Sequence, residues 1–124
     1  MTRKRLLDLV DLRFKDMDEA CIDVQVLSHC PPGAQAFDPN EAKERSAGVN
    51  DRLHDFILTN PARFRGFATL PTRTPELAAD ELKRCHRELG FHGAIVHGLT
   101  EGEFIYMPRF WPIFERAEFL DILI

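Results

Sequence analysis

Two short segments hold the side chains best suited to chemistry in this sequence. Ser28-His29-Cys30 directly follows the apolar run 24–27, and His97 closes the apolar run 93–96. A hydroxyl, a thiol and an imidazole can each hydrogen-bond a ligand, and an imidazole also accepts or donates a proton near neutral pH. We predict that Ser28, His29, Cys30 and His97 bind a substrate. The alternative for His97 is a packed residue that is bonded to a neighbouring loop.

Cys30 has a second possible role as a nucleophile. A catalytic cysteine needs a nearby base to form its thiolate, and His29 or His97 are the candidates. Adjacent residues of a strand point to opposite faces, so His29 is a poor partner unless the chain has already turned. A loop thiol without a catalytic role is therefore the favoured interpretation.

The histidines do not form a metal-binding pattern. A mononuclear zinc or manganese site needs three or four converging ligands, often announced by His-x-His or His-Glu-x-x-His. The five histidines contain neither spacing. His54 and His86 fall within predicted helices and His92 begins a predicted strand, so we expect them at the surface. The sequence predicts no metal ligand and no catalytic residue in this chain.

Composition limits the class of protein. The chain has 124 residues, of which 44% are hydrophobic and 29% charged, enough for a single globular domain over 1–124. A net charge of −4 and a pI near 5.7 argue against a nucleic-acid surface. The basic run 3–5 begins like a targeting signal, but Asp8 and Asp11 interrupt it, and no stretch is apolar enough to span a membrane. The three cysteines lack Cys-x-x-Cys spacing, which favours a cytoplasmic setting.

Helices and strands alternate along the chain and would position the candidate residues. Apolar periodicity predicts four helices, at 6–20, 39–59, 75–89 and 109–120. Asp38, Pro39 and Glu41 suggest a capping box at the start of the second helix, and Gly90 ends the third. Four apolar strands are predicted, at 24–27, 65–70, 93–97 and 121–124. Pro31-Pro32 prevents regular secondary structure from continuing after the first of them.

Strands separated by helices pair in parallel, which predicts an α/β barrel or a doubly wound sheet. No Gly-x-Gly-x-x-Gly or Walker motif follows any strand, so the nucleotide-binding sheets lose support. In parallel folds the carboxyl ends of the strands carry the site. Ser28–Cys30 and His97 both occupy such positions.

Several runs of this sequence resemble the amidohydrolase-related family. They are Met17–Ser28, Val49–Leu53, Pro61–Pro71, Glu81–Ala94 and Pro108–Ala117. Members of the family include metal-dependent decarboxylases of aromatic acids, such as γ-resorcylate and aminocarboxymuconate-semialdehyde decarboxylase, together with hydrolases and hydratases. The resemblance covers nearly the whole chain.

The resemblance implies part of a (β/α)8 TIM barrel, from the helix after strand one through strand five. It also implies a divalent zinc or manganese ion in the intact enzyme, bound by ligands outside this chain, so we expect no metal on the chain alone. The implied substrate is a small, aromatic carboxylic acid. His97 would then hydrogen-bond its carboxylate or phenolic oxygen.

Three hypotheses for function follow. The first is a segment of a metal-dependent decarboxylase or hydrolase, catalytically inert by itself; the apolar run 121–124, with no loop after it, suggests a cut before a functional loop. The second is a non-catalytic α/β remnant that associates with itself as a homo-oligomer or with another segment. The third is a self-contained thiol or histidine enzyme.

Overall fold

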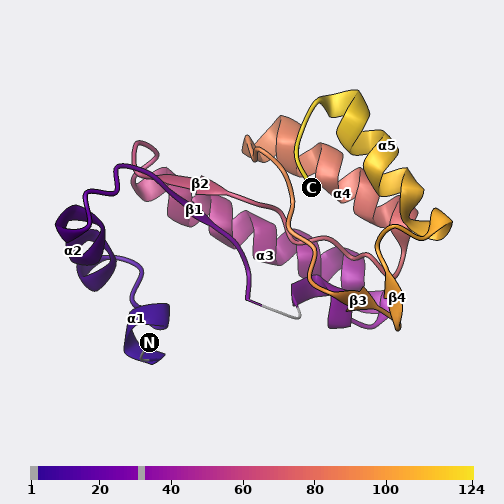
Figure 1. Cartoon of the computed structure of the whole chain (residues 1–124), viewed down its shortest axis with the longest axis horizontal. Helices are drawn as coiled ribbons and strands as arrows, with labels where there is room; N and C mark the ends of the chain where they lie inside the picture. Colours follow the sequence, from indigo (N-terminus) through magenta and orange to yellow (C-terminus); the bar gives the residue numbers. More distant parts are fainter. Residues whose placement is uncertain (1–2, 31–32) are drawn as a thin grey trace.

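The computed structural model describes residues 3–30 and 33–124 of the chain (Figure 1). The elements in chain order are α1 (Arg3–Leu7), α2 (Asp11–Glu19), β1 (Gln25–Leu27), η1 (Gly33–Ala36), α3 (Pro39–Thr59), β2 (Phe64–Gly66), α4 (Pro75–Leu89), β3 (Leu99–Thr100), β4 (Glu103–Phe104), η2 (Pro108–Phe110) and α5 (Trp111–Leu120). The expected break at Pro31 and Pro32 lies outside the described residues. Within the described ranges, no helix is both long and apolar enough to cross a bilayer.

Four segments of extended chain lie side by side in chain order, and all are parallel. β1 pairs with β2 in a register that places Val26 opposite Arg65. Beyond β2, Ala68 bridges the 93–94 segment, which in turn bridges Leu123. Because helices separate these segments in the sequence, the predicted α/β arrangement with parallel strands is confirmed at this level.

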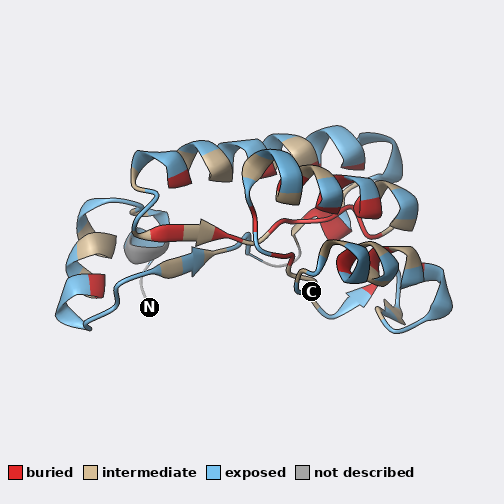
Figure 2. Cartoon of the chain, turned by 90° about the horizontal axis from the view of Figure 1, so that it is seen from above, coloured by how far each residue is buried: buried red, intermediate tan, exposed pale blue. Residues whose placement is uncertain are grey.

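The core lies between the strand segments and the long helices. The ring of Phe64 on β2 is fully buried, with its centroid 5.4 Å from that of Phe14 and 5.0 Å from that of Phe56. Burying one such side chain contributes about 1.5–3 kcal/mol. Helix α3 runs alongside β1 and β2 in Figures 1 and 2, and α4 packs against both α3 and α5. The apolar stripe predicted for the last helix is buried at Phe110, Ile113 and Ala117.

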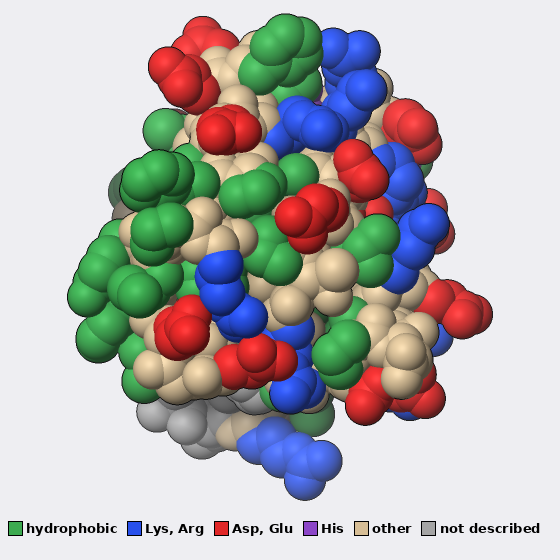
Figure 3. Space-filling model, turned by 90° about the vertical axis from the view of Figure 1, so that its right-hand side faces the viewer, with side chains coloured by type: hydrophobic (Ala, Val, Ile, Leu, Met, Phe, Trp, Pro, Cys, Tyr) green, Lys and Arg blue, Asp and Glu red, His purple; other side chains and the backbone are tan. Residues whose placement is uncertain are grey.

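Apolar side chains remain exposed along the strand segments. The exposed fractions are 44% for Val24, 48% for Val26 and 68% for Leu123. Val24 and Val26 share one side of the extended chain because side chains alternate along it. Figure 3 shows hydrophobic side chains gathered toward one side of the face that carries α5 and the β3–β4 hairpin. Among the described residues, the outer edge of β1 has no strand partner.

The single helix predicted over 6–20 is wrong: the structure contains α1 and α2 instead. Asp8 Oδ1 accepts hydrogen bonds from the backbone N–H groups of Val10 (3.0 Å) and Leu12 (3.1 Å). An aspartate that bonds nearby backbone donors favours a turn and satisfies the first free N–H groups of the next helix. At the end of α2, Cys21 adopts φ 56°, the left-handed conformation that usually favours glycine.

Helix caps follow the prediction in part. Asp38 Oδ1 accepts a hydrogen bond from the N–H of Asn40 (2.9 Å) at the start of α3, and Gly90 adopts φ 70° at the end of α4. The capping box is wrong, because the Glu41 carboxylate pairs with Arg45 (2.9 Å) one turn later. Exposed carboxylate–guanidinium pairs at this spacing add only a few tenths of a kcal/mol, about 0.3–0.5.

Three of the predicted strands are shorter than expected. The strand predicted over 65–70 is reduced to β2 and one bridge at Ala68. Residues 93–97 hold bridges only at Gly93 and Ala94, and 121–124 only at Leu123. Asp121, the first residue of the latter, instead closes α5 in the left-handed region at φ 54°. The loop after 93–97 forms the antiparallel β3–β4 hairpin, which the sequence did not predict.

Aromatic side chains extend from this hairpin into the solvent. The rings of Phe104 and Tyr106 stack with centroids 5.8 Å apart and an interplanar angle of 13°. Trp111, at the start of α5, donates its indole N–H to the carbonyl oxygen of Tyr106 (3.1 Å). All three residues are exposed. The indole hydrogen bond therefore ties the segment after the hairpin to α5.

Candidate functional site

His97 lies at the carboxyl end of its segment, beside the loop that follows β1. Its Nε2 is 3.3 Å from the carbonyl oxygen of His29. A carbonyl oxygen only accepts hydrogen bonds, so Nε2 carries a proton and Nδ1 of the neutral ring keeps its lone pair. Among the described residues, Nδ1 has no hydrogen-bond partner. The structure thus brings His97 to the His29 backbone, as the loop-bonded alternative for His97 expected.

Ser28, His29 and Cys30 are exposed and line a groove between β1, α2 and α3. The groove has a volume of about 650 Å³. Its other lining residues are mainly apolar, with two arginines: Leu9, Arg13, Gln25, Val26, Leu27, Val49, Arg52, Leu53 and Phe56. His97 is not among the residues that line this groove, so binding of one substrate by all four residues stays a prediction. The structure places His97 against the His29 backbone, while the three loop residues line the groove.

Cys30 has no imidazole hydrogen-bonded to its thiol in the part of the chain that the structure describes. The ring of His97 bonds the His29 carbonyl, and the thiol is exposed. The remaining histidines lie elsewhere. His54 and His86 are half-buried on helices, although they were expected at the surface, and His92, just before the bridge at Gly93, is exposed. His86 Nδ1 is bonded to the Phe91 carbonyl at 3.1 Å, a structural contact.

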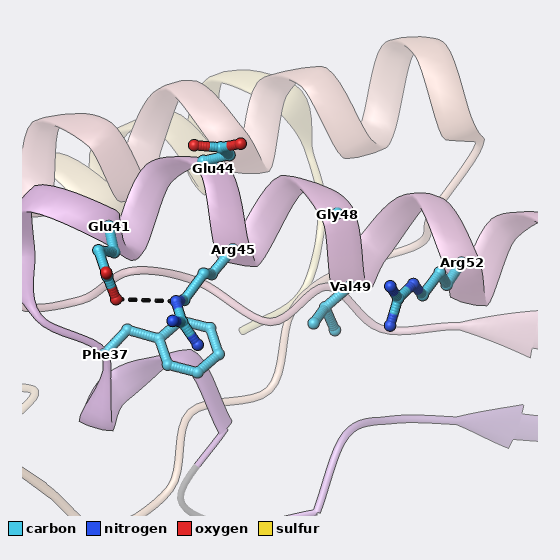
Figure 4. Close-up of a pocket in the computed structure, with 7 residues that line it drawn as sticks. All are labelled: Phe37, Glu41, Glu44, Arg45, Gly48, Val49 and Arg52. Atoms are coloured by element: carbon cyan, nitrogen blue, oxygen red, sulfur yellow. Dashed lines mark ion pairs between the residues drawn. The ribbon is translucent and has the colours of Figure 1, made fainter.

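A second cavity, of about 490 Å³, lies along α3 next to Phe37 (Figure 4), and it shares Val49 and Arg52 with the groove. Arg45 occupies one end, where its guanidinium pairs with Glu41 and lies 5.8 Å from the centroid of the Phe37 ring. Figure 4 shows Val49 and Arg52 further along the helix, away from this pair. The ion pair offsets the charges of Glu41 and Arg45, and Glu44 and Arg52 also line the cavity.

Side-chain amides fix the strand ends, and few sequence signals indicate them. Asn50 on α3 donates to the Thr69 carbonyl oxygen and accepts from the Thr69 N–H, both at 2.9 Å. Gln35 on η1 makes the same two kinds of bond to His97. Asn50 shares the buried face of α3 with Ala42 and Ser46, so its apolar surroundings were a usable signal. Gln35 had none.

A charged network holds the β3–β4 hairpin. Glu101 accepts from Arg73 (2.8 Å) and from Arg109 (3.1 Å), and Arg109 also pairs with Glu103 (3.0 Å). The hydrogen bond from Arg73 is the main reason that the pKa of Glu101 is lowered. Arg73 follows β2, so the network joins two loops at the carboxyl ends of the strands.

A buried network joins α3 and α4. Glu81 accepts hydrogen bonds from the Asn50 amide (2.9 Å) and from the Arg84 guanidinium (2.8 Å). The bonds with Glu81 raise the pKa of Arg84, and burial raises the pKa of the Cys85 thiol one turn away. These groups stabilise helix packing, and the thiol stays protonated at neutral pH.

The residues present do not fit a divalent metal ion. In the described ranges, no three histidine, cysteine or carboxylate side chains converge. His97 also commits Nε2 to a carbonyl oxygen, which leaves it one free nitrogen. A stable zinc or manganese site needs three or four ligands, so we derive no metal chemistry from this chain.

Comparison with known proteins identifies relatives over nearly the full chain. A family model described as amidohydrolase matches residues 4–124. The γ-resorcylate decarboxylase of Polaromonas sp. strain JS666 is 42% identical over 127 residues, which cover 97% of this chain and 39% of the relative. The 2-amino-3-carboxymuconate-6-semialdehyde decarboxylase of Dictyostelium discoideum is 34% identical, covering 87% of this chain and 30% of the relative.

Solved structures show the same similarity. The dihydroxybenzoic acid decarboxylase of Polaromonas sp. JS666, with bound manganese and 2-nitroresorcinol, has a TM-score of 0.90 and 42% identity, covering 97% of this chain and 38% of that one. The 5-carboxyvanillate decarboxylase of Novosphingobium aromaticivorans, complexed with manganese, has a TM-score of 0.89 and 38% identity, covering 96% and 34%.

These relatives confirm two predictions made from the sequence. The resemblance to metal-dependent decarboxylases of aromatic acids is confirmed, and the divalent metal expected in the intact enzymes is manganese in both solved structures. The chain spans about 39% of the length of the first curated relative. What the relatives do as whole proteins therefore extends beyond the residues present here.

Proposed function

Because this chain belongs to the amidohydrolase family, we propose that it is a segment of a manganese-dependent decarboxylase that acts on a small aromatic carboxylic acid. The observation that carries the proposal is the 42% identity to γ-resorcylate decarboxylase over 97% of the chain. In our proposal the segment contributes contacts to the substrate and no metal ligands. By itself it is catalytically inert.

The proposed architecture is part of a (β/α)8 barrel. Support comes from the parallel order of the strand segments and from the helices α3, α4 and α5 that separate them in the sequence. A complete barrel takes roughly 250 residues, about twice the length of this chain. Residues 121–124 would form the start of a fifth strand, and Val26 and Leu123 would face the barrel interior.

His97 is the proposed contact for the substrate. With Nε2–H directed at the His29 carbonyl, Nδ1 can accept a hydrogen bond from a phenolic hydroxyl or from a carboxylic acid proton. The γ-resorcylate decarboxylase and a 2,6-dihydroxybenzoate decarboxylase solved with 2,6-dihydroxybenzoate are named for a hydroxylated benzoic acid, which presents such donors beside the carboxylate. Ser28, His29 and Cys30 would line the entrance.

A chimeric enzyme tests this function. The matching segment of the Polaromonas γ-resorcylate decarboxylase is replaced with this chain, and release of CO2 from 2,6-dihydroxybenzoate is measured with and without added Mn²⁺. We expect manganese-dependent turnover, whereas the 124-residue chain alone should release none. A chimera that folds and binds manganese but is inactive on hydroxybenzoates would sink the proposal.

Self-association is the second candidate function. The free outer edge of β1 and the exposed side chains of Val24, Val26 and Leu123 favour it, since unpaired strand edges readily add another chain. In this proposal the isolated chain forms homo-oligomers. Sedimentation velocity over a range of concentrations decides the point, and a monomer at every concentration would remove it.

A further inference from the structure

The side-chain amide of Gln35 makes the hydrogen bonds to the His97 backbone that a neighbouring strand would otherwise make. Gln35 Nε2 donates to the His97 carbonyl oxygen (2.8 Å), and Oε1 accepts from the His97 N–H. A parallel strand would satisfy those two groups in the same way, yet the ladder of this segment stops at Ala94 and Ile95. The side chain therefore explains why the segment can end early without leaving buried backbone groups unpaired.

Gln35 is itself held firmly. Only 9% of the residue is exposed, and Nε2 donates a second hydrogen bond to Thr100 Oγ1 (2.9 Å), which is paired with Thr72 Oγ1 (2.8 Å). The turn that carries Gln35 is tied to the segment after β2 because the Ala34 N–H donates to Thr69 Oγ1 (3.0 Å). Each polar atom of the Gln35 amide thus has a partner, and the amide has one orientation that satisfies all of them.

The turn also lies close to the imidazole. A Cβ atom added to Gly33 would come within 3.8 Å of His97 Cδ2 and within 3.0 Å of Thr69 Oγ1. The ring is thus bounded by the turn on one side and by the His29 carbonyl at Nε2. The hydrogen bonds to the His97 backbone fix the position from which its side chain extends. The neighbouring turn and the His29 carbonyl then restrict the orientation of the imidazole ring.

We propose that Gln35 is a positioning residue that holds the His97 imidazole as the Nε2–H tautomer, with Nδ1 open to a phenolic or carboxylic acid proton. The proposal deepens the proposed function and rests on it for the role of Nδ1. Gln35 contacts no substrate; it acts through the backbone of His97. Sequence alone gave this residue no role.

Asn50 provides a matched control. It clamps the backbone of Thr69 with the same pair of hydrogen bonds, and it is buried like Gln35 but makes no hydrogen bond to His97. Substitution of either amide should loosen the fold to a similar degree. A change in the imidazole tautomer should follow only from Gln35.

The test is nitrogen-15 NMR of the histidine ring at a pH where the imidazole is neutral. The wild-type chain should show His97 mainly as the Nε2–H tautomer. Gln35→Met, which keeps volume but not hydrogen bonds, should give a mixture of tautomers, whereas Asn50→Leu should retain the wild-type pattern. An unchanged His97 signal in Gln35→Met, or an equal change in Asn50→Leu, overturns the proposal.

Hydrogen exchange of the wild-type chain gives a second readout if the variants fail to fold. The His97 amide should exchange several-fold more slowly than that of Val96, whose N–H has no hydrogen-bond partner in the described structure. Equal exchange would overturn the clamp. Neither readout needs turnover, so an inactive chimera would reject the proposed function without rejecting the role of Gln35.

Discussion

Asn50 on α3 and Thr69 beyond β2 are joined by two hydrogen bonds of 2.9 Å that satisfy both backbone groups of Thr69. The contact links the long helix to the carboxyl end of the neighbouring strand. Asn50 Nδ2 reaches Glu81 on α4 as well. One buried amide therefore fixes three elements around the candidate site.

Asn50→Ala should destabilise the protein strongly. The substitution leaves the Thr69 N–H and carbonyl groups and a Glu81 oxygen without this partner, and each buried group left unpaired costs about 1–3 kcal/mol. We expect a loss of roughly 3 kcal/mol in urea denaturation followed by circular dichroism. Lys43→Ala on the exposed face of the same helix is the control. Equal midpoints for the two variants would contradict the prediction.

Gly93 and Gly48 should respond in opposite ways to alanine. A Cβ at Gly93 would clash with the Leu123 carbonyl oxygen, while nothing lies within 4 Å of a Cβ at Gly48. Gly93→Ala should destabilise by about 1–3 kcal/mol, because the backbone must shift. Gly48→Ala should stabilise α3 by about 0.5–1 kcal/mol. Thermal melts of both variants check the signs, and a shared direction would refute the close approach.

Cys85 should resist alkylation in the folded chain. Its side chain is fully buried and its thiol has a raised pKa, so the reactive thiolate is scarce at neutral pH. Cys21 and Cys30 are exposed. Iodoacetamide followed by peptide mass spectrometry should label Cys21 and Cys30 first and Cys85 only in denaturant. Early labelling of Cys85 would show that α4 does not pack as described.

The hairpin network should weaken in acid. Bonding to Arg73 lowers the pKa of Glu101 below its ordinary value of 4.5, so the carboxylate stabilises the fold above that pH. The stabilisation is lost as the pH falls through the lowered pKa. Glu101→Gln should therefore melt below wild type at neutral pH and converge with it in strong acid. A constant difference across this range would refute the role of the charge, and Glu76→Gln, an exposed carboxylate on α4, is the control.

Sequence patterns predicted the fold best where periodicity and caps agreed. The stripes of α3, α4 and α5, the αL residue Gly90 and the parallel order of strands all follow from local signals. The interruption between α1 and α2 at Asp8 was missed because an aspartate occurs both within helices and at their ends. Only the hydrogen bonds of its carboxylate to the Val10 and Leu12 N–H groups show which case applies.

The candidate site was harder to predict. His97 and the 28–30 loop were chosen as candidates because strand ends are where parallel folds place their chemistry. The partner of His97 could not be found, since the contact uses the backbone of His29 and spans 68 positions. Gln35 lies 62 positions from His97, and one glutamine in a loop carries no signal until the turn is folded. The cytoplasmic location and the role of His97 as a substrate contact stay predictions.

The bond between the Trp111 indole and the Tyr106 carbonyl makes the chain its own optical reporter. The sequence has one tryptophan and one tyrosine, so neither emission is diluted by a second copy. Release of the segment after the hairpin would break this bond and increase the exposure of the indole, which is already half-exposed. A ligand that moves the loops at the strand ends could thus be followed by fluorescence, with no label attached.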